Sequence, residues 1–150
     1  MEIKKLAHAE GAPMRLLLLA DPSESHVRDY LRRGECHVAY EMDQPVGVYV
    51  LLPTRPETIE LVNVAVDESA QGKGIGKQLI HHAVHNARSQ GYKTIEVGTG
   101  NSSIGQLALY QKCGFRLIGV DFDFFTRHYP KRIIENGIHC RDMIRLSQDL

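Results

Sequence analysis

One loop limits what this chain can fold into more than any other feature. The run QGKGIGK, residues 71–77, lies between an apolar segment and a segment whose apolar residues recur every three or four positions. A glycine-rich turn between a strand and a helix gathers backbone N–H groups at the positive end of the helix, which favours an anion there. The glycines lack side chains that would hold a phosphate away, and the two lysines add charge. The alternative is a flexible, solvated turn.

Three phosphate-binding patterns compete for this loop. A nucleoside-triphosphate loop needs GxxxxGK followed by Ser or Thr, whereas residues 72–78 read GxxxGKQ, one residue short and without the hydroxyl group that binds magnesium. A dinucleotide loop needs GxGxxG, but these glycines run GxGxG, although Glu96 lies where a ribose-binding acid is expected. The third pattern, Q/R-x-x-G-x-G/A, fits residues 71–76 completely.

Composition bounds the remaining choices. The chain has 150 residues, so we expect one core and a single domain over residues 1–150. Its 18 Lys plus Arg balance 18 Asp plus Glu, which gives no electrostatic argument for nucleic acid or an anionic membrane. No apolar run is long enough to span a bilayer, and the first residues lack the pattern of a signal peptide, so we expect a cytoplasmic protein.

The cysteine pattern argues against a disulfide framework and against a zinc site. Cys36, Cys113 and Cys140 are odd in number, widely spaced and without a CxxC pair, and the chain has no HExxH motif. We therefore expect reduced thiols in the core and no metal.

Local patterns predict alternating helices and strands. Ser23 can cap the second helix, Pro13 fits the first turn of the first helix, and Gly34 is expected to end the second helix in the left-handed conformation. The expected segments are strand Glu2–Leu6, helix Ala12–Ala20, helix 23–34, strands Cys36–Glu41, Val46–Thr54 and Thr58–Val66, a helix from Gly74 to Gly91, strand Thr94–Val97, helix Ser103–Lys112, strand Phe115–Val120, a long connection Asp121–Asn136, and strand Ile138–Leu146.

The loop, the strand before it and the segment NSSIGQLALYQKCGF after it together resemble the GCN5-related N-acetyltransferase (GNAT) superfamily. The resemblance covers the order of elements as well as the motif, from about residue 2 to residue 147. It implies an α/β (α+β) fold with a mixed central sheet of six to seven strands. The sheet would have an antiparallel N-terminal meander, splayed central parallel strands and about four helices.

The resemblance also implies that acetyl-CoA is the co-substrate. The N–H groups of the loop would hold its pyrophosphate, and its pantetheine arm would pair with the backbone near Val64 and Val66, which requires strand Thr58–Val66 to splay from strand Thr94–Val97. Asn101 would reach the arm from the far side; a loop or cap asparagine is the alternative. The residues expected to bind the co-substrate are Val64, Ala65, Val66, Gln71, Gly72, Lys73, Gly74, Ile75, Gly76, Lys77, Asn101 and Tyr110.

Two residues are expected to move protons. An alkylammonium acceptor must lose a proton before it attacks a thioester. Glu60 stands in an otherwise apolar strand, where an isolated carboxylate is costly to bury, and by resemblance it is the base; a solvent-exposed strand end is the alternative. By resemblance Tyr110 is the acid for the departing thiolate; a core aromatic is the alternative. Weaker candidates are Glu96, His128 and His139.

The resemblance implies that the acceptor contacts the N-terminal helices and the segment between the last strands, which here is the connection after residue 120. Its aromatic residues suit an amine with an apolar body, while its acids could attract a cation or pair with neighbouring basic residues. The aromatic residues are Phe122, Phe124, Phe125 and Tyr129; the acids are Asp121, Asp123 and Glu135; the basic residues are Arg127, Lys131 and Arg132.

We therefore expect an N-acetyltransferase that acts on a small-molecule amine. The alternatives are a protein lysine or N-terminal acetyltransferase, a non-catalytic CoA-binding sensor module and, less favoured by the loop, an NAD(H)-dependent oxidoreductase. Many relatives pair through their C-terminal strands, so we also expect a homodimer.

Overall fold

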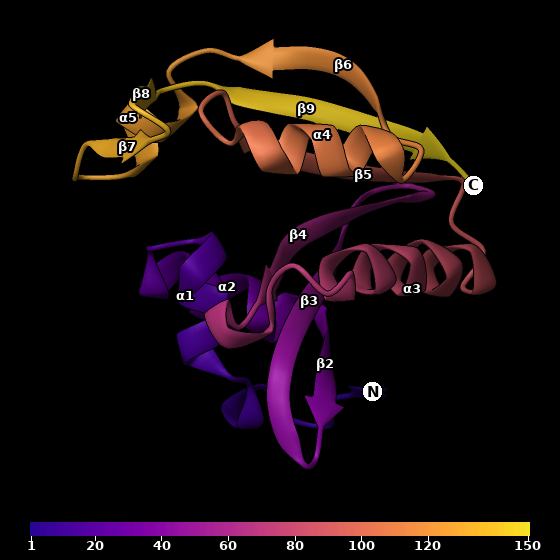
Figure 1. Cartoon of the computed structure of the whole chain (residues 1–150). Helices are drawn as coiled ribbons and strands as arrows, with labels where there is room; N and C mark the ends of the chain where they lie inside the picture. The colour runs from indigo at the N-terminus through magenta and orange to yellow at the C-terminus, as the bar shows by residue number, and fades with distance from the viewer.

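A seven-stranded mixed sheet runs through the computed structural model, which describes residues 1–150 (Figure 1). Its strand order is β1-β2-β3-β4-β5-β9-β6, and a separate hairpin pairs β7 with β8. The strands are β1 (Glu2–Lys5), β2 (Glu35–Glu41), β3 (Gln44–Arg55), β4 (Thr58–Val66), β5 (Thr94–Gly100), β6 (Arg116–Asp121), β7 (Ile133–Glu135), β8 (Ile138–Cys140) and β9 (Met143–Asp149). The helices are α1 (Met14–Ala20), α2 (Glu24–Arg33), α3 (Ile75–Ser89), α4 (Ile104–Lys112) and α5 (Phe124–His128), with short 3-10 turns at Ala9–Gly11 and Glu68–Ala70. The predicted α/β fold is confirmed.

Helices cover both faces of the half of the sheet that contains β2, β3 and β4. On one face, α1 and α2 pack with these strands in a core cluster that includes Leu16, Leu17 and Val27. On the other face, the apolar stripe of α3, from Ile75 to Ala87, packs in a second cluster. The predicted cap of α2 is confirmed, because the side chain of Ser23 accepts a hydrogen bond from the N–H group of His26. The three cysteines are buried and free, as expected.

Strand β4 leaves β5 at a bulge. Parallel pairing between the two strands ends at the pair Leu61 and Val97. On the opposite edge of β4, Leu61 and Asn63 pair with consecutive residues of β3, so Val62 is an extra residue in the ladder. A bulge bends its strand and increases its twist. The two central strands therefore diverge beyond it, which confirms the predicted splay (Figure 1).

Two expectations about the first helices were wrong in detail. Pro13 precedes α1 instead of lying in its first turn. Gly34 ends α2 with φ −110° and ψ −170°, which is an extended conformation and not the left-handed one. Gly34 is needed there for space, because an added Cβ would lie 2.5 Å from the carbonyl oxygen of Leu51.

The predicted last strand, Ile138–Leu146, was wrong, because it is two strands in two different sheets. Its first part, β8, pairs with β7, while β9 inserts between β5 and β6. The chain turns between them at Arg141 and Asp142, whose N–H groups both donate to the side-chain oxygen of Asn101. The connection Asp121–Asn136 is likewise not irregular, since it contains α5 and β7.

No helix of the chain combines the length and the apolar character needed to cross a membrane.

Candidate active site

The predicted phosphate loop leaves six consecutive backbone donors free. None of the N–H groups of residues 72–77 donates a hydrogen bond within the chain, and the first bond of α3 joins the N–H group of Gln78 to the carbonyl of Gly74. Gly72 and Gly74 have φ angles of 80° and 81°, which side-chain-bearing residues rarely adopt. An added Cβ at either glycine would meet no atom within 4 Å. The loop is therefore an open concave set of donors that suits a phosphate or pyrophosphate.

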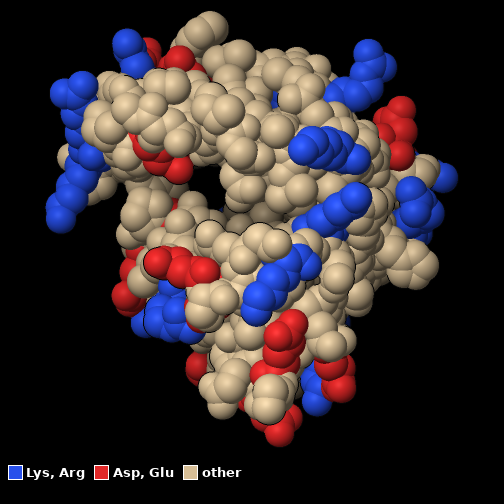
Figure 2. All heavy atoms as spheres, viewed as in Figure 1, with Lys and Arg blue, Asp and Glu red and all other residues tan.

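Charge around the loop favours the same ligand. The first turn of α3 contains no acidic residue, while Lys73 and Lys77 belong to the run of free donors and add positive charge to it. The side chain of Gln71 donates to the carbonyl of Val66 at 3.1 Å, which ties the loop to the end of β4. In Figure 2, several Lys and Arg side chains lie on the rim beside a hollow in the surface.

The edge of β4 beyond the bulge faces the gap between the two central strands. Val64 and Ala65 are buried, and they belong to the core clusters on opposite faces of the sheet. Their backbone therefore stands at the edge of β4 where no β5 residue pairs with it. An extended chain of amides can add to such an edge in the manner of a strand.

The side chain of Asn101 is hydrogen-bonded within the chain. Its side-chain nitrogen donates to the carbonyl of His139 at 3.1 Å, and its side-chain oxygen accepts from Arg141 and Asp142. Asn101 does not line the cavity described below. The side chain of Asn101 thus holds the turn between β8 and β9, and its predicted contact with the pantetheine arm stays a prediction.

A cavity of about 670 Å³ opens where β4 and β5 splay apart, and helices from both the N-terminal and the C-terminal half of the chain line it. Its walls come from the α1–α2 region, β4, β5, α4, α5, β7 and β9. Glu60 and Tyr110 both line it, so the structure brings together the two residues predicted to move protons. Figure 2 shows the hollow from the same side as Figure 1.

Glu60 meets the cavity without a partner. It is half-buried and forms no hydrogen bond or ion pair within the chain. Burial raises the pKa of its carboxyl group, as does the nearby charge of Glu96, whereas Arg145 and Arg55 act in the opposite direction. Glu96 itself pairs with Arg55 at 2.6 Å. A carboxylate with a raised pKa and a free lone pair is suited to accept a proton near neutral pH.

Tyr110 enters the cavity from α4 on the other side of the gap. It is 4% exposed and packs edge-on against Phe115, with ring centroids 5.9 Å apart. Its hydroxyl group forms no hydrogen bond within the chain. Burial, and to a smaller extent Cys113, raises the pKa of Tyr110 above its ordinary value. The hydroxyl group therefore keeps its proton and can donate it to a group in the cavity.

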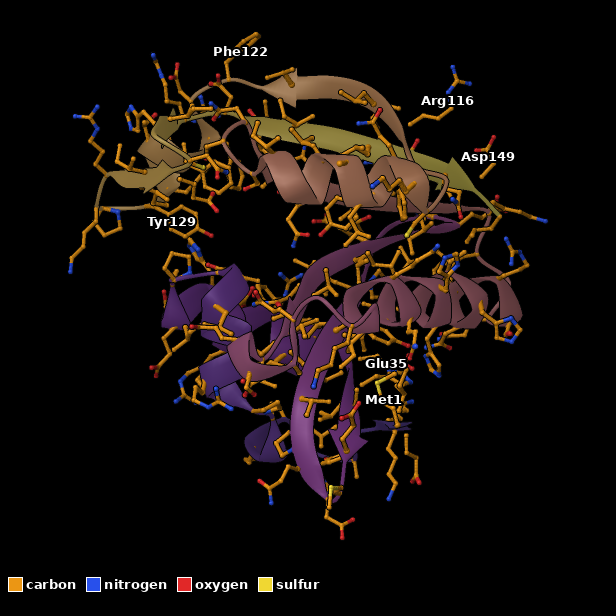
Figure 3. The ribbon with its side chains drawn as sticks, viewed as in Figure 1. Met1, Glu35, Arg116, Phe122, Tyr129 and Asp149 are labelled. Carbon is orange, nitrogen blue, oxygen red and sulfur yellow. The ribbon has the colours of Figure 1, made fainter.

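A chain of hydrogen bonds closes the end of the cavity farthest from α3. The hydroxyl groups of Tyr129 and Tyr30 donate to the two carboxylate oxygens of Asp21 at 2.8 and 3.1 Å. The amide of Asn63, at the bulge of β4, donates in turn to the hydroxyl group of Tyr30 at 2.8 Å. Figure 3 shows Tyr129 reaching from the α5 region toward the N-terminal helices. The network joins residues 108 positions apart in the sequence.

The predicted acceptor segment divides into two parts. Phe124, Phe125 and Tyr129 line the cavity, whereas Phe122 is 67% exposed and points away from it (Figure 3). Asp121 pairs with Arg127 at 3.0 Å, so for this acid the expected alternative of a neighbouring basic partner is confirmed. Of the weaker candidates, His128 lines the cavity and His139 does not.

Sequence reasoning missed Asn63, Tyr30, Asp21 and Arg145 as cavity residues. Asn63 carried a usable signal, since it is an amide in an apolar strand, and it is 4% exposed in the fold. The other three have ordinary surface-like surroundings in the sequence and meet only through the tertiary fold.

Known proteins resemble this chain in sequence and in fold. The sequence model of the Acetyltransferase (GNAT) family matches residues 6–115. The uncharacterized N-acetyltransferase YvbK of Bacillus subtilis (strain 168) is 62% identical over 135 residues, which cover 90% of this chain and 87% of that protein. A Bacillus subtilis acetyltransferase solved in complex with CoA is 57% identical, with a TM-score of 0.95 over 99% of this chain and 98% of the other. The IAA acetyltransferase from Bacillus cereus ATCC 14579 is 56% identical, with a TM-score of 0.97 over 99% of each chain.

Proposed function

This chain belongs to the GNAT family of acetyltransferases, which use acetyl-CoA, and we propose that it moves the acetyl group to the primary amine of a small molecule. The observation that carries the proposal is that Glu60 and Tyr110 line one cavity, with Glu60 one residue before the last pair between β4 and β5 and therefore next to the start of the free edge of β4. A protein that only binds CoA needs neither an unpaired carboxylate nor an unpaired phenol there.

The open donors of the loop fit the pyrophosphate of acetyl-CoA, and residues 72–77 would hold it there. When bound, acetyl-CoA supplies an acetyl group already activated as a thioester. The backbone of Val64 and Val66 would orient the pantetheine arm along the free edge of β4. These residues would thereby aim the ligand into the cavity between Glu60 and Tyr110.

The two side chains divide the proton transfers between them. Glu60 accepts the proton of the acceptor ammonium, directly or through a water molecule, and its raised pKa brings it closer to the acid it must deprotonate. Tyr110 donates its hydroxyl proton toward the departing sulfur, because burial keeps that proton in place. Holding amine and thioester in one cavity contributes more than either group alone, since effective molarities reach about 10⁵–10⁸ M against about 10²–10⁴ for one acid or base.

A small acceptor is favoured over a protein side chain by the closed end of the cavity. The Tyr129–Asp21 hydrogen bond joins α5 to the α1–α2 connection across the end of the cavity. A protein substrate would have to open this contact to enter along that direction. A small amine with an apolar body needs no such opening.

The experiment measures free thiol released from acetyl-CoA with a panel of polyamines, amino acids, aminoglycosides and peptides. The solved Bacillus cereus relative is called an IAA acetyltransferase, so IAA is added to the panel. Acetyl transfer to a small amine supports the proposal, and product identity is checked by mass. Acetylation of peptides alone would favour a protein acetyltransferase, and binding of acetyl-CoA without transfer to any member would favour a sensor module.

Removing one hydroxyl group tests the role of Tyr110. The Tyr110→Phe variant should be slowed by about 10²- to 10⁴-fold in kcat while it still binds acetyl-CoA. Tyr92→Phe is the matched control, because Tyr92 packs against the same core cluster and does not line the cavity. Turnover of Tyr110→Phe within about twofold of the parent would remove Tyr110 from the mechanism.

A further inference from the structure

The charged side chains of the cavity differ in whether they already form hydrogen bonds or ion pairs within the chain. Four carboxylates line the cavity, and three of them are occupied. Asp21 accepts from two tyrosine hydroxyl groups and one backbone N–H group. Asp29 pairs with Arg33 at 2.8 Å, and Glu135 accepts from two serine hydroxyl groups at 2.9 and 3.1 Å. Glu60 is therefore the one acid in the cavity that is free to meet a ligand.

The same test separates the two arginines that line the cavity. Arg33 is held by two hydrogen bonds to Asp29. Arg145, on β9, has a single contact, to Oδ2 of Asp121 at 3.6 Å, which is longer than a hydrogen bond; the other oxygen of Asp121 is bound by Arg127 at 3.0 Å. A guanidinium group has five N–H donors in a planar fork. Apart from this one contact the donors of Arg145 have no acceptor within the chain; the residue lines the cavity and its side chain is 39% exposed.

The sheet places Glu60 and Arg145 on one face. Glu60 pairs with Glu96 of β5, and Gly98, two residues further along β5, pairs with Arg145 of β9. Residues paired across strands share a face, as do residues two apart in one strand. Arg145 is two strands away from Glu60 across the sheet and two residues away along it, so the spacing of strands and residues in a sheet puts their Cα atoms roughly 12 Å apart. No ion pair joins the two side chains, so a small molecule between them can meet both.

We propose that the acceptor is an amino acid, whose carboxylate binds Arg145 while its amine lies at Glu60. The arginine fork matches a carboxylate in a bidentate geometry, which a lysine or a neutral donor does not reproduce. The apolar wall formed by Phe124, Phe125 and Met143 would receive the side chain of that amino acid. Arg145 is thus an anchoring residue for the substrate, and the inference rests on the proposed function.

Matched acceptors test the inference directly. The wild-type protein is assayed with phenylalanine against 2-phenylethylamine, leucine against 3-methylbutylamine, and lysine against cadaverine; each pair differs by the carboxylate. A charged hydrogen-bonded pair should give the acid-bearing member about a ten- to hundredfold higher kcat/KM, mainly through KM. Equal rates, or a preference for the amine without the carboxylate, would overturn the inference.

Two variants of Arg145 test whether this residue causes the preference for acceptors with a carboxylate. Arg145→Gln should lose the preference for the acid-bearing member of each pair, and Arg145→Lys should restore only part of it. Arg127→Gln is the matched control, because Arg127 also pairs with Asp121 and does not line the cavity; it should keep the full preference. A preference retained in Arg145→Gln would overturn the assignment.

Calorimetric titration of phenylalanine into CoA-saturated protein separates this inference from the proposed function. Binding that depends on Arg145, without acetyl transfer to any amine, would refute the proposed function and leave the carboxylate site standing. Acetyl transfer to amines without any preference for a carboxylate would refute only the site. Neither binding nor transfer would refute both.

Discussion

The two halves of the central sheet differ in how they are covered. Strands β2, β3 and β4 contribute side chains to core clusters on both of their faces. Strands β5 and β9 contribute to only one cluster, and every residue of β6 except Asp121 is exposed. The uncovered face of β5 and β9 carries Glu96, Gly98, Arg145 and Ser147. Arg145 lies where the sheet is covered on one face only, and Glu60 lies on β4, where the doubly covered half meets it.

The largest expected effect is a loss of activity without a loss of stability, when Glu60 is replaced on β4 between the two halves of the sheet. Glu60→Gln should lower kcat by about 10²- to 10⁴-fold, or about 3–5 kcal/mol in activation free energy, because the base is lost. The melting temperature should stay or rise, since the substitution removes a charge that burial disfavours. Steady-state kinetics and calorimetric melting are measured on the same preparation. Loss of stability equal to the loss of activity would contradict the comparison.

The doubly covered half should respond in the opposite way. Leu16 is 0% exposed in the cluster between α1, α2 and the sheet, and Leu16→Ala should cost about 2–5 kcal/mol of unfolding free energy through lost burial and a cavity. Leu117→Ala, at a 55% exposed position of β6 in the other half of the sheet, should stay within about 0.5 kcal/mol. Urea unfolding measures both. Similar costs at the two positions would mean that the halves do not differ in packing.

A smaller effect concerns two histidines of the doubly covered half, one on β2 and one on α3. Burial lowers the pKa of both His37 and His82 below their ordinary value of 6.5. His37 faces Glu35, Lys5, Tyr49 and His82, and its Nδ1 atom has no partner. The folded state therefore disfavours the protonated rings. Their contribution to stability is complete above pH 6.5 and is lost as the pH falls from there toward the lowered pKa values.

The histidine effect is measured as the difference in unfolding free energy between the wild type and His82→Gln from pH 8 to pH 5. The difference is needed because Glu60, with a raised pKa, changes stability in the opposite direction as the pH falls. We expect the wild type to lose more stability than the variant on acidification. Equal pH dependence would rule out His82 as a source of it.

The smallest effect on the folded chain concerns the two edges of the sheet. Edge strand β1 carries the charged residues Glu2, Lys4 and Lys5, whereas β6 exposes the run LIGV between Arg116 and Asp121. Charged edges oppose strand addition and apolar ones permit it. If β6 pairs antiparallel with a second copy, Arg116 of one copy faces Asp121 of the other, and we expect the homodimer at this edge.

Light scattering during gel filtration tests the edge. We expect a dimer for the wild type and a monomer for Ile118→Lys, which places a charge in β6. Met42→Lys is the control, because Met42 is 96% exposed at the opposite end of the molecule. A wild-type monomer, or dissociation by the control as well, would count against pairing through β6.

Sequence reasoning succeeded where the determinants are local. The bounds of β4 and the glycine loop follow from β-branched residues, from three closely spaced glycines and from the change of period after Gly74. Glu60 stands out in the sequence because a carboxylate in an apolar strand is costly without a role, and the fold places it in the wall of the cavity. These signals lie within a few residues of one another in the chain.

The rest of the site depends on contacts between distant segments. Tyr129 meets Asp21 across 108 positions, and no local pattern pairs them. Arg145 lies on the same face of the sheet as Glu60, near to it, only because β9 and not β6 is the strand next to β5. The order of strands in the sequence does not determine this arrangement. The bonds of Asn101 to the turn between β8 and β9 could not be predicted for the same reason, since that turn directs β9 into the sheet.

The most direct test of the account is a titration of acetyl-CoA followed by the amide ¹⁵N–¹H spectrum of the assigned protein. We expect the largest changes on the free donors of residues 72–77 and on the amides of β4 beyond the bulge, at Val64 and Val66. Amides of β1 and β2 should change little. Unchanged amides at residues 72–77, with binding seen elsewhere in the chain, would contradict the claim that this loop and the splayed strands form the acetyl-CoA site.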